Sequence, residues 1–404
     1  MHPSSRPLVS SLLVLALAAC GEVGSQAAGE LAAAPGAVAA DSARADSAAA
    51  ASPADTARAA ARAPVDSAAE LPVVRGLYVN RHAAQSARRM RKLIAMADST
   101  EVNALVIDIK DEFGLNYRSQ DTLVSRNAGA MGTIPNLAAL LDTLEAHEIV
   151  SIARLVVFKD SVAARRNPTH VIRTRDGAPW RDKQGLTWVN PYDRAIWEYN
   201  IRVAEEMARM GFDEIQFDYI RFPEPYKSLP EQVFPGANGQ SKPDVLAAFL
   251  GEACPRIRRA GARCTADIFG LVTTVNGALE IGQQWEKLAP VADVLLPMTY
   301  PSHYPSGAFG IARPNAAPYD IQKIANARAV ERNTKLGLTG ERVRPWLQAF
   351  TLGKPPYGGP EIEAQKKGVY DAGIEGWILW HPGSLYEPFL SGLEREGAAT
   401  AARP

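Results

Sequence analysis

The sequence contains few cysteines and histidines, three and six respectively among 404 residues. So few cysteines exclude a disulfide-rich scaffold, and neither residue type has the spacing of a zinc site. The Gly-x-Ser-x-Gly turn of serine hydrolases and the His-Glu-x-x-His motif of zinc peptidases are also absent. We therefore expect neither a metal nor another cofactor.

An excess of charge of either sign is lacking as well, because 44 Lys and Arg residues balance 44 Asp and Glu residues. A net charge of zero creates no overall field that would draw the protein to nucleic acid or to an anionic membrane. We therefore expect no nucleic-acid partner.

Residues 8–19 form an apolar run of about twelve residues close to the N-terminus. A helix this short does not cross the ~30 Å hydrocarbon core of a bilayer, so residues 1–20 are predicted to be a signal peptide. The run ends in Leu17-Ala18-Ala19-Cys20-Gly21, which resembles the lipobox of bacterial lipoproteins. That resemblance implies export, lipidation of Cys20 and anchoring to the cell envelope, at the outer membrane or the periplasmic face. The alternative is an ordinary secretory signal in which the cysteine has no role.

Residues 21–70 consist largely of Ala, Ser, Asp, Pro and Gly, with few large apolar side chains. Such a segment cannot bury enough apolar area to offset the entropy lost on ordering, so we predict a disordered linker. Residues 394–404 are predicted to be a disordered tail for the same reason. A single folded domain is expected between them, over residues 71–393.

Cys254 and Cys264 remain as an even pair if Cys20 carries lipid. In an oxidising compartment they are expected to form a disulfide between a helix and the strand that follows it. The alternative is that both are small buried core residues.

From residue 71 onward, strand-like and helix-like segments alternate. Eight strand-like runs are predicted at residues 73–79, 104–109, 150–157, 214–218, 263–268, 291–296, 344–350 and 376–379. Amphipathic helical segments are predicted at residues 84–99, 137–147, 194–210, 244–259, 283–289, 321–332, 362–372 and 385–393. This alternation predicts an α/β fold, the (β/α)8 or TIM barrel. An open, doubly wound sheet is less consistent, because no glycine-rich phosphate turn follows the first run. Ordered loops over the catalytic face are expected at residues 110–136 and 158–193.

The fourth run contains the most informative polar side chains. Strand alternation puts Glu214, Gln216 and Asp218 on one face, opposite Ile215 and Phe217. In a barrel the polar set should face the interior, with Asp218 at the C-terminal end, where barrel enzymes carry catalytic groups. A salt bridge that only fixes the loop is the alternative role for this aspartate.

The fifth run supplies a second inward carboxylate, Asp267. Glycoside hydrolysis generally uses two carboxyl groups, one as acid and one as nucleophile or base, and adjacent strands can bring them close enough. The alternative is that Asp267 is a structural partner of Arg154 or Lys110. Glu224, on the loop after the fourth run, is the reserve candidate for the acid.

Several other residues are expected to contact the substrate. Asp108 and Lys110 are predicted to share one face of the second run, with Lys110 aimed at the mouth of the barrel. Aromatic rings stack on sugar C–H surfaces, although a single tryptophan is more often part of a core. The remaining candidates are Tyr78, Arg154, Arg221, Tyr300, His303, Trp346, Gln348, Trp377, Trp380 and His381.

Five motifs in order resemble a bacterial glycoside hydrolase family first catalogued as a domain of unknown function, DUF4015, which is related to the alpha-amylase-like barrels. They begin at Gly76, Leu105, Ile152, Glu214 and Leu296, and the fourth reads Glu-Ile-Gln-Phe-Asp-Tyr-Ile-Arg-Phe-Pro. The resemblance implies a (β/α)8 barrel with glycosidase activity. It also implies that Asp218 is the nucleophile. The related enzymes commonly carry a glutamate as acid at the end of strand five, where this sequence has Asp267.

Taken together, these features predict a glycosidase that acts on a bacterial or environmental polysaccharide, with Asp218 as nucleophile or stabiliser and Asp267 as acid/base. The alternative is a polysaccharide-binding envelope lipoprotein on a degenerate barrel, which would retain the aromatic residues but would not need both carboxylates.

Overall fold

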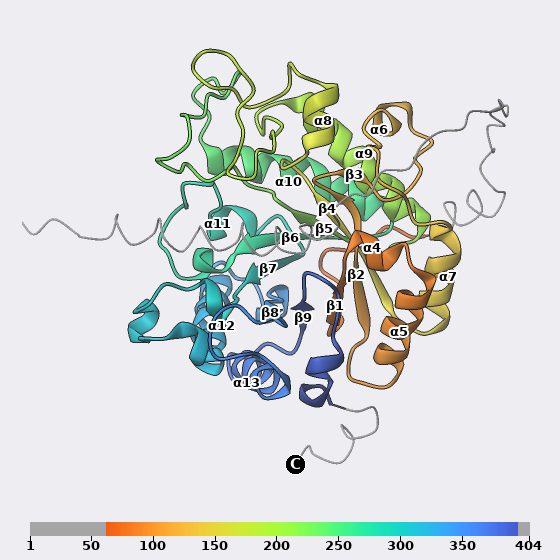
Figure 1. Cartoon of the computed structure of the whole chain (residues 1–404), viewed down its shortest axis with the longest axis vertical. Helices are drawn as coiled ribbons and strands as arrows, with labels where there is room; N and C mark the ends of the chain where they lie inside the picture. Colours follow the sequence, from red (N-terminus) through yellow and green to blue (C-terminus); the bar gives the residue numbers. More distant parts are fainter. Residues whose placement is uncertain (1–61, 395–404) are drawn as a thin grey trace, which may run out of the picture.

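Eight parallel strands close into a barrel in the computed structural model, which describes residues 62–394 (Figure 1). Strand β1 pairs with both β2 and β9, and this pairing closes the sheet. The barrel strands are β1 (Arg75–Val79), β2 (Ala104–Asp111), β4 (Val150–Val156), β5 (Glu214–Asp218), β6 (Arg263–Phe269), β7 (Val294–Met298), β8 (Trp346–Gln348) and β9 (Trp377–Trp380). Strand β3 (Gly114–Leu115) is a short antiparallel extension of β2. The predicted (β/α)8 barrel is confirmed.

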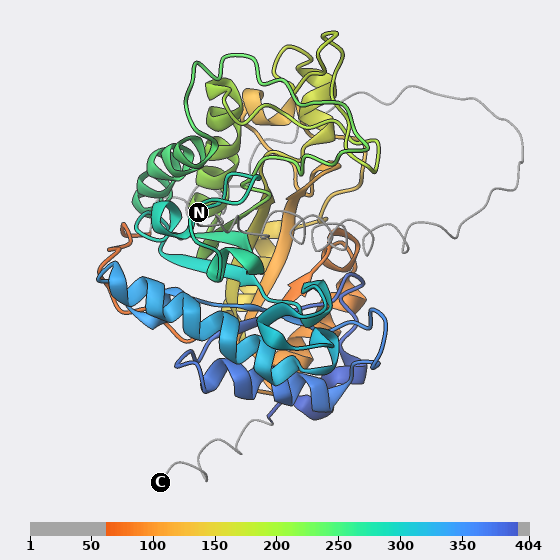
Figure 2. The same ribbon diagram turned by 90° about the vertical axis from the view of Figure 1, so that its left-hand side faces the viewer.

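Helices surround the barrel, and α12 and α13 lie side by side on one flank (Figure 2). The α-helices are α4 (Arg81–Ala84), α5 (Ala87–Asp98), α6 (Thr122–Ser125), α7 (Leu137–Ala146), α8 (Ser161–Arg166), α9 (Arg194–Met210), α10 (Lys242–Arg259), α11 (Trp285–Leu288), α12 (Pro318–Lys335) and α13 (Gly359–Tyr370). Strand β9 is followed only by a short 3-10 helix, η6 (Glu387–Gly392). The last position of the helical layer therefore lacks a full α-helix, and the position between β6 and β7 holds only the four-residue α11.

The two faces of β5 differ as strand alternation requires. Phe217 faces outward, and its ring lies 5.2 Å from that of Phe249 on α10. Glu214, Gln216 and Asp218 face the interior, where a second apolar cluster that includes Val106 and Ile152 fills the rest of the space. The barrel is thus a packed core with polar groups at both ends.

Two long loops meet over the C-terminal ends of the strands, in the upper part of Figure 1. One runs from β4 to α9 and the other from β5 to α10. The Trp180 Nε1 donates a hydrogen bond to the Pro230 carbonyl at 2.9 Å, and the Asn190 Nδ2 donates to the Pro235 carbonyl at 2.8 Å. These bonds hold the two loops together as an ordered rim.

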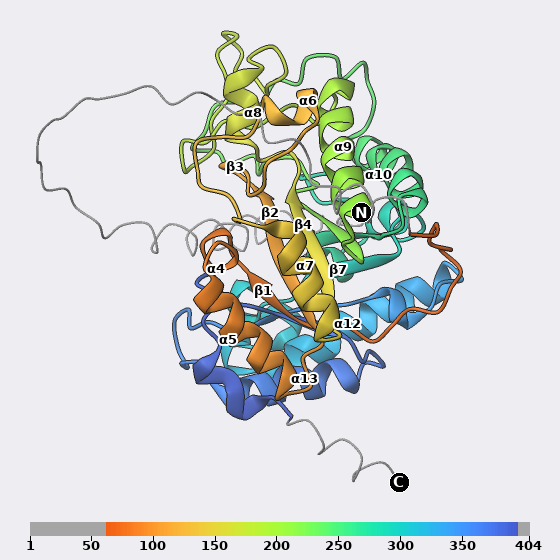
Figure 3. The ribbon, with the colours of Figure 1, turned by 90° about the vertical axis from the view of Figure 1, so that its right-hand side faces the viewer.

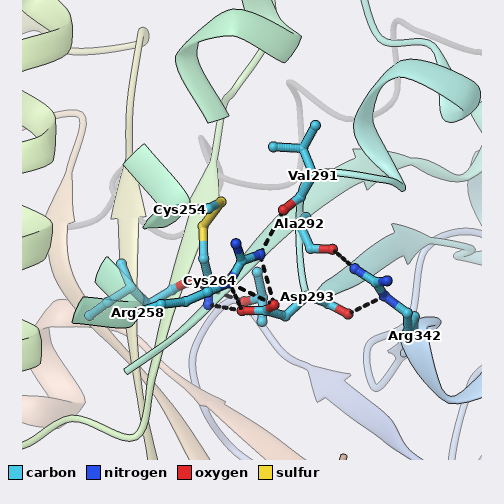
Figure 4. Close-up of a disulfide and its surroundings, with 9 residues drawn as sticks. Cys254, Arg258, Cys264, Val291, Ala292, Asp293 and Arg342 are labelled. Atoms are coloured by element: carbon cyan, nitrogen blue, oxygen red, sulfur yellow. Dashed lines mark hydrogen bonds and ion pairs between the residues drawn. A yellow bond between two sulfur atoms is a disulfide. The ribbon is translucent and has the colours of Figure 1, made fainter. Parts of the chain in front are cut away.

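A disulfide joins Cys254 on α10 to Cys264 on β6, with an S–S distance of 2.04 Å (Figure 4). The backbone N–H of Cys264 donates to the Asp293 carboxylate at 2.7 Å, and Arg258 forms an ion pair with the same carboxylate at 2.8 Å. The disulfide and this ion pair together fix α10 to the N-terminal ends of β6 and β7.

The described chain begins at Arg62, inside the predicted linker. Arg62 forms an ion pair with Asp213 at 2.8 Å, and the Val65 amide donates to the Arg258 carbonyl at 2.9 Å. Residues 62–70 therefore contact the barrel. The predicted signal peptide, Cys20 and the rest of the linker lie outside the described residues, as does the tail beyond residue 394. Within residues 62–394, no helix is both long and apolar enough to cross a membrane.

Candidate active site

Strand β5 delivers Asp218 to the mouth of the barrel. The next residue, Tyr219, has a φ of 49°, a left-handed conformation that is uncommon for a residue with a side chain. The Tyr219 amide donates to the Asp218 Oδ1 at 2.6 Å, so the sharp turn fixes this carboxylate. Asp218 keeps 7% of its surface exposed, which leaves it accessible from the pocket.

Arg154, on β4, connects three carboxyl groups. Its guanidinium donates to the Asp108 carboxylate at 2.5 Å and to that of Asp218, and its Nε lies 4.0 Å from the Asp267 Oδ2. The Tyr78 hydroxyl donates to the other oxygen of Asp108 at 2.5 Å. Burial opposes the charge of Arg154, but the carboxylates of Asp218 and Asp108 raise its pKa well above its usual value. One permanent cation therefore serves three acidic residues from neighbouring strands.

Asp267, on β6, lies deeper than Asp218 and is 1% exposed. Its carboxyl group accepts hydrogen bonds from the Trp346 Nε1 at 2.7 Å and from the Gln216 Nε2 at 2.9 and 3.0 Å. Burial is the largest influence on its pKa and raises it, and the negative charge of Asp218 raises it further. Arg154 and the two donors oppose this shift without cancelling it. Asp267 is therefore the carboxyl group suited to hold a proton.

A pocket opens above these two aspartates. Its lining residues are Arg154, Asp218, Tyr219, Arg221, Asp267, Phe269, Met298, Tyr300, His303, Trp346 and Trp380. The cavity at its centre has a volume of about 80 Å³, enough for a few water molecules. A sugar unit bound here would extend into the open mouth.

Aromatic rings form one wall of the pocket. The Trp380 ring stacks on that of Tyr78 with centroids 6.0 Å apart and lies 5.7 Å from the ring of Tyr300. The His303 ring packs edge-on against Tyr300 at 5.3 Å. Burial lowers the pKa of His303 to about 4, so the imidazole is neutral near pH 7 and can both donate and accept hydrogen bonds.

Arg221 lines the opposite side of the pocket. Its guanidinium lies 4.7 Å from the ring centroids of both Tyr219 and Phe269 and 5.0 Å from that of Trp188. Glu224 forms an ion pair with Arg221 at 3.1 Å and does not line the pocket. This geometry favours a role for Glu224 in holding Arg221 rather than as the reserve acid.

Lys110 does not lie where the strand pattern predicted. The register between β2 and β4 shifts between Asp108 and Lys110, so the two side chains no longer share a face. Lys110 is fully buried outside the barrel, in an ion pair with Asp160 at 2.8 Å and 5.3 Å from the ring of Tyr199. Its expected contact with substrate is therefore not supported by its position.

Tyr78 and Asp108, which contact Arg154, do not line the pocket. Three further candidates also lie away from it. Trp377 is buried in the outer core, where its Nε1 donates to the Tyr370 hydroxyl at 3.1 Å. The Gln348 Oε1 accepts from the Ser302 amide at 3.0 Å, which fixes the loop after β7. The His381 Nδ1 accepts from the Gly383 amide at 2.9 Å and so shapes the loop after β9.

Three residues that line the pocket were not among the candidates predicted from the sequence: Tyr219, Phe269 and Met298. All three lie at or directly after the C-terminal end of a barrel strand. Position at the end of a barrel strand therefore indicates a pocket residue whether its side chain is polar, aromatic or aliphatic. Among residues 62–394, no group of three or more His, Cys, Asp and Glu side chains is arranged to hold a metal ion.

Comparisons with solved structures agree with the fold. The glycoside hydrolase domain of PgaB (BpsB) from Bordetella bronchiseptica superposes with a TM-score of 0.57 at 17% identity, covering 79% of this chain and 97% of that one. Alpha-L-fucosidase isoenzyme 2 from Paenibacillus thiaminolyticus gives 0.53 at 12% identity, covering 80% of this chain and 48% of that one. A hypothetical protein from Ruminiclostridium thermocellum is 35% identical over 47% of this chain and 96% of its own, with a TM-score of 0.43. At these identities, the first two comparisons establish the shared barrel fold.

Sequence comparison adds the family. No curated protein sequence matches the chain. The model of the DUF4015 family, described as "Putative glycosyl hydrolase domain", matches residues 76–386, which include all the barrel strands except the first residue of β1. The chain therefore belongs to the DUF4015 family of glycosyl hydrolase domains.

Proposed function

We propose that this protein hydrolyses glycosidic bonds of a polysaccharide through Asp218 and Asp267. The observation that carries this proposal is the arrangement of two carboxyl groups of opposite character around Arg154. Asp218 is paired with the guanidinium at the pocket surface, whereas Asp267 is buried with a raised pKa. Glycosidases need such a pair, one carboxylate and one carboxylic acid.

In the proposed reaction, Asp267 donates its proton to the glycosidic oxygen while the bond from that oxygen to the anomeric carbon breaks. Asp218, as a carboxylate, attacks the anomeric carbon or stabilises the positive charge that develops on it. Water then supplies a hydroxyl group to the anomeric carbon, and its remaining proton restores the protonated enzyme. Trp346 and Gln216 support this sequence because their hydrogen bonds fix the orientation of the Asp267 carboxyl group.

The pocket walls support a carbohydrate substrate. Trp380 and Tyr300 offer aromatic surface beside the two aspartates, and such rings pack against the C–H faces of sugars. His303 and Arg221 add hydrogen-bond donors that can reach hydroxyl groups. This combination of aromatic surface and a few polar groups is typical of small-molecule and sugar sites.

The test is sugar release from a panel of bacterial exopolysaccharides and cell-wall glycans by the full chain and by Asp218→Asn and Asp267→Asn. Each substitution should lower the rate at least about a hundredfold, since each removes a group that acts on the reacting atoms. Asp320→Asn is the matched control, because Asp320 is exposed on α12, and its rate should not change.

Two results would overturn the proposal. One is full activity in either active-site variant. The other is no release from any glycan, with glycan binding that is the same in the parent and in both variants, and this result would favour a non-catalytic polysaccharide-binding lipoprotein.

We also propose that the protein is exported and anchored through lipid on Cys20. The disulfide between Cys254 and Cys264 supports export, because structural disulfides persist mainly in oxidising compartments. Radiolabelled palmitate should be incorporated into the parent and not into Cys20→Ser, and the variant should leave the membrane fraction. Labelling of the Cys20→Ser variant would contradict the lipid anchor.

A further inference from the structure

A second concave surface lies on the outer wall of the barrel, between α5 and residues 384–387. It encloses about 390 Å³. The hollow occurs where β9 is followed by the six-residue η6 instead of a full α-helix, so α5 lacks a neighbour of normal length. Figure 3 shows α5 beside the C-terminal turns of the described chain.

The α5 wall of this groove is basic. Arg88, Arg89 and Lys92 line it, and Glu387 is the one acidic residue among its lining residues. Lys92 forms an ion pair with Glu387 at 3.4 Å while its side chain stays 61% exposed. Arg88 is exposed and has no ion-pair partner among residues 62–394. In a protein with no net charge, this groove has a local excess of positive charge.

The groove adjoins the mouth of the barrel. The Asn80 amide, directly after β1, donates to the Ser384 Oγ at 2.9 Å, and Ser384 lines the groove. The Tyr386 hydroxyl donates to the backbone carbonyl of Tyr78 at 2.8 Å. The ring of Tyr78 stacks on Trp380 in the pocket wall. Tyr386, which lines the groove, is therefore connected through Tyr78 to Trp380 in the wall of the proposed active site.

The shape of the groove favours a polymer strand over a membrane surface. Its apolar floor, Leu93, Met96 and Tyr386, is at most 8% exposed and cannot insert into lipid. Leu385 is the only large apolar residue of the lining that is well exposed, at 50%. A recessed floor with a cationic rim suits a chain with regularly spaced anionic groups.

We infer that this groove binds a strand of carboxylate-bearing polysaccharide whose continuation enters the pocket. Carboxylates along the strand pair with Arg88 and Lys92, while the sugar rings cover the floor formed by Leu93 and Met96. The inference rests on the proposed glycosidase function only for the nature of the polymer. Binding in the groove requires neither Asp218 nor Asp267.

The test measures binding of the full chain, carrying Asp218→Asn to prevent hydrolysis, to polygalacturonate and to neutral dextran. Polygalacturonate should bind more tightly than dextran, and salt should weaken its binding because exposed charges are screened. Arg88→Glu should weaken polygalacturonate binding at least about fivefold, since an attractive contact becomes repulsive. The matched control is Arg91→Glu on the same helix, because Arg91 is exposed but does not line the groove.

Equal weakening by Arg88→Glu and Arg91→Glu would overturn the inference, because it would indicate attraction to the general charge of α5. Binding to vesicles of phosphatidylcholine and phosphatidylglycerol that depends on Arg88, with no binding to polygalacturonate, would overturn it in favour of a membrane contact. Glycan hydrolysis by the enzyme without Asp218→Asn is measured separately, so failure of the groove and failure of the proposed function remain distinguishable.

Discussion

The two ends of β5 carry two buried ion pairs that differ in their balance of charge. At the N-terminal end, Glu214 forms a two-point contact with Arg344, at 2.6 and 3.1 Å, and both side chains are at most 3% exposed. At the C-terminal end, Arg154 contacts Asp218 and Asp108 and lies near Asp267. The lower pair has one cation for one anion, whereas the upper cluster has one cation for three carboxyl groups.

This difference distinguishes an ion pair that stabilises the fold from a charged cluster that can take part in catalysis. At the lower end, one guanidinium matches one carboxylate. Where carboxyl groups outnumber cations, burial and mutual repulsion favour the protonated form. Burial raises the pKa of Asp108, and burial followed by the negative charge of Asp218 raises the pKa of Asp267 well above its usual value, so Asp267 is the group suited to hold the proton. Strand β5 thus supplies the carboxylate of a closed ion pair at one end and, at the other, the carboxylate that partners the acid Asp267 of β6.

The largest expected effect comes from removing the cation of the upper cluster. Arg154→Leu should lower kcat/KM for glycan hydrolysis by about a hundredfold or more, because Asp218 loses the charge that orients it. Arg154→Lys should restore only part of the activity, since an ammonium group cannot contact several carboxylates in the planar geometry of a guanidinium. Steady-state rates on the glycan identified in the panel provide the measurement. Unchanged activity in Arg154→Leu would show that catalysis does not depend on the balance of charge in the upper cluster.

The next largest effect is expected when the lower ion pair is broken, and it should appear in stability and not in catalysis. Glu214→Gln leaves Arg344 buried without a counter-charge and should reduce the free energy of unfolding by about 3–5 kcal/mol. At temperatures where the variant is folded, kcat/KM should stay within about twofold of the parent, because Glu214 does not line the pocket. Urea unfolding followed by fluorescence measures the first quantity.

Glu331→Gln is the control for that experiment. It makes the same chemical change in the exposed i,i+4 ion pair with Lys335, which lies on α12. Its unfolding midpoint should match that of the parent. A large loss of activity in folded Glu214→Gln would remove the distinction between the two ends of the barrel.

Local sequence patterns predicted the bounds of β5 and of the preceding helix α9 well. The bounds of β5 and α9 agree with the predicted runs 214–218 and 194–210. The reasons are physical: strict alternation defines the strand, while the Asp193 side chain caps the start of α9 and Gly211, with a φ of 112°, ends it. Where the backbone is regular, the hydrophobic period and the capping residues are sufficient to predict the bounds of a strand or helix.

Irregular backbone explains where prediction of the site failed. The register shift in β2 sends Lys110 outward, and no side-chain pattern marks that shift. Trp377 begins the last strand and Trp380 ends it, and only Trp380 faces the pocket, because alternation puts the two side chains on opposite faces. The hydrogen bond from Trp346 to Asp267 joins residues 79 positions apart, so only the closed barrel brings them together.

The smallest expected effect comes from removing the hydrogen bond that Trp346 donates to the proposed acid, Asp267. Trp346→Phe removes the donor that lies 2.7 Å from the Asp267 Oδ1. This donor stabilises the ionised carboxylate, so its loss should raise the pKa of Asp267 beyond the rise that burial and Asp218 already cause. The acid then stays protonated to higher pH, and the basic limb of the profile of kcat/KM against pH should move upward. Trp377→Phe makes the same change at a tryptophan whose Nε1 donates to Tyr370 outside the barrel, and its basic limb should stay in place. A limb that moves downward in Trp346→Phe, or moves equally in both variants, would show that Asp267 is not the group whose protonation controls the rate.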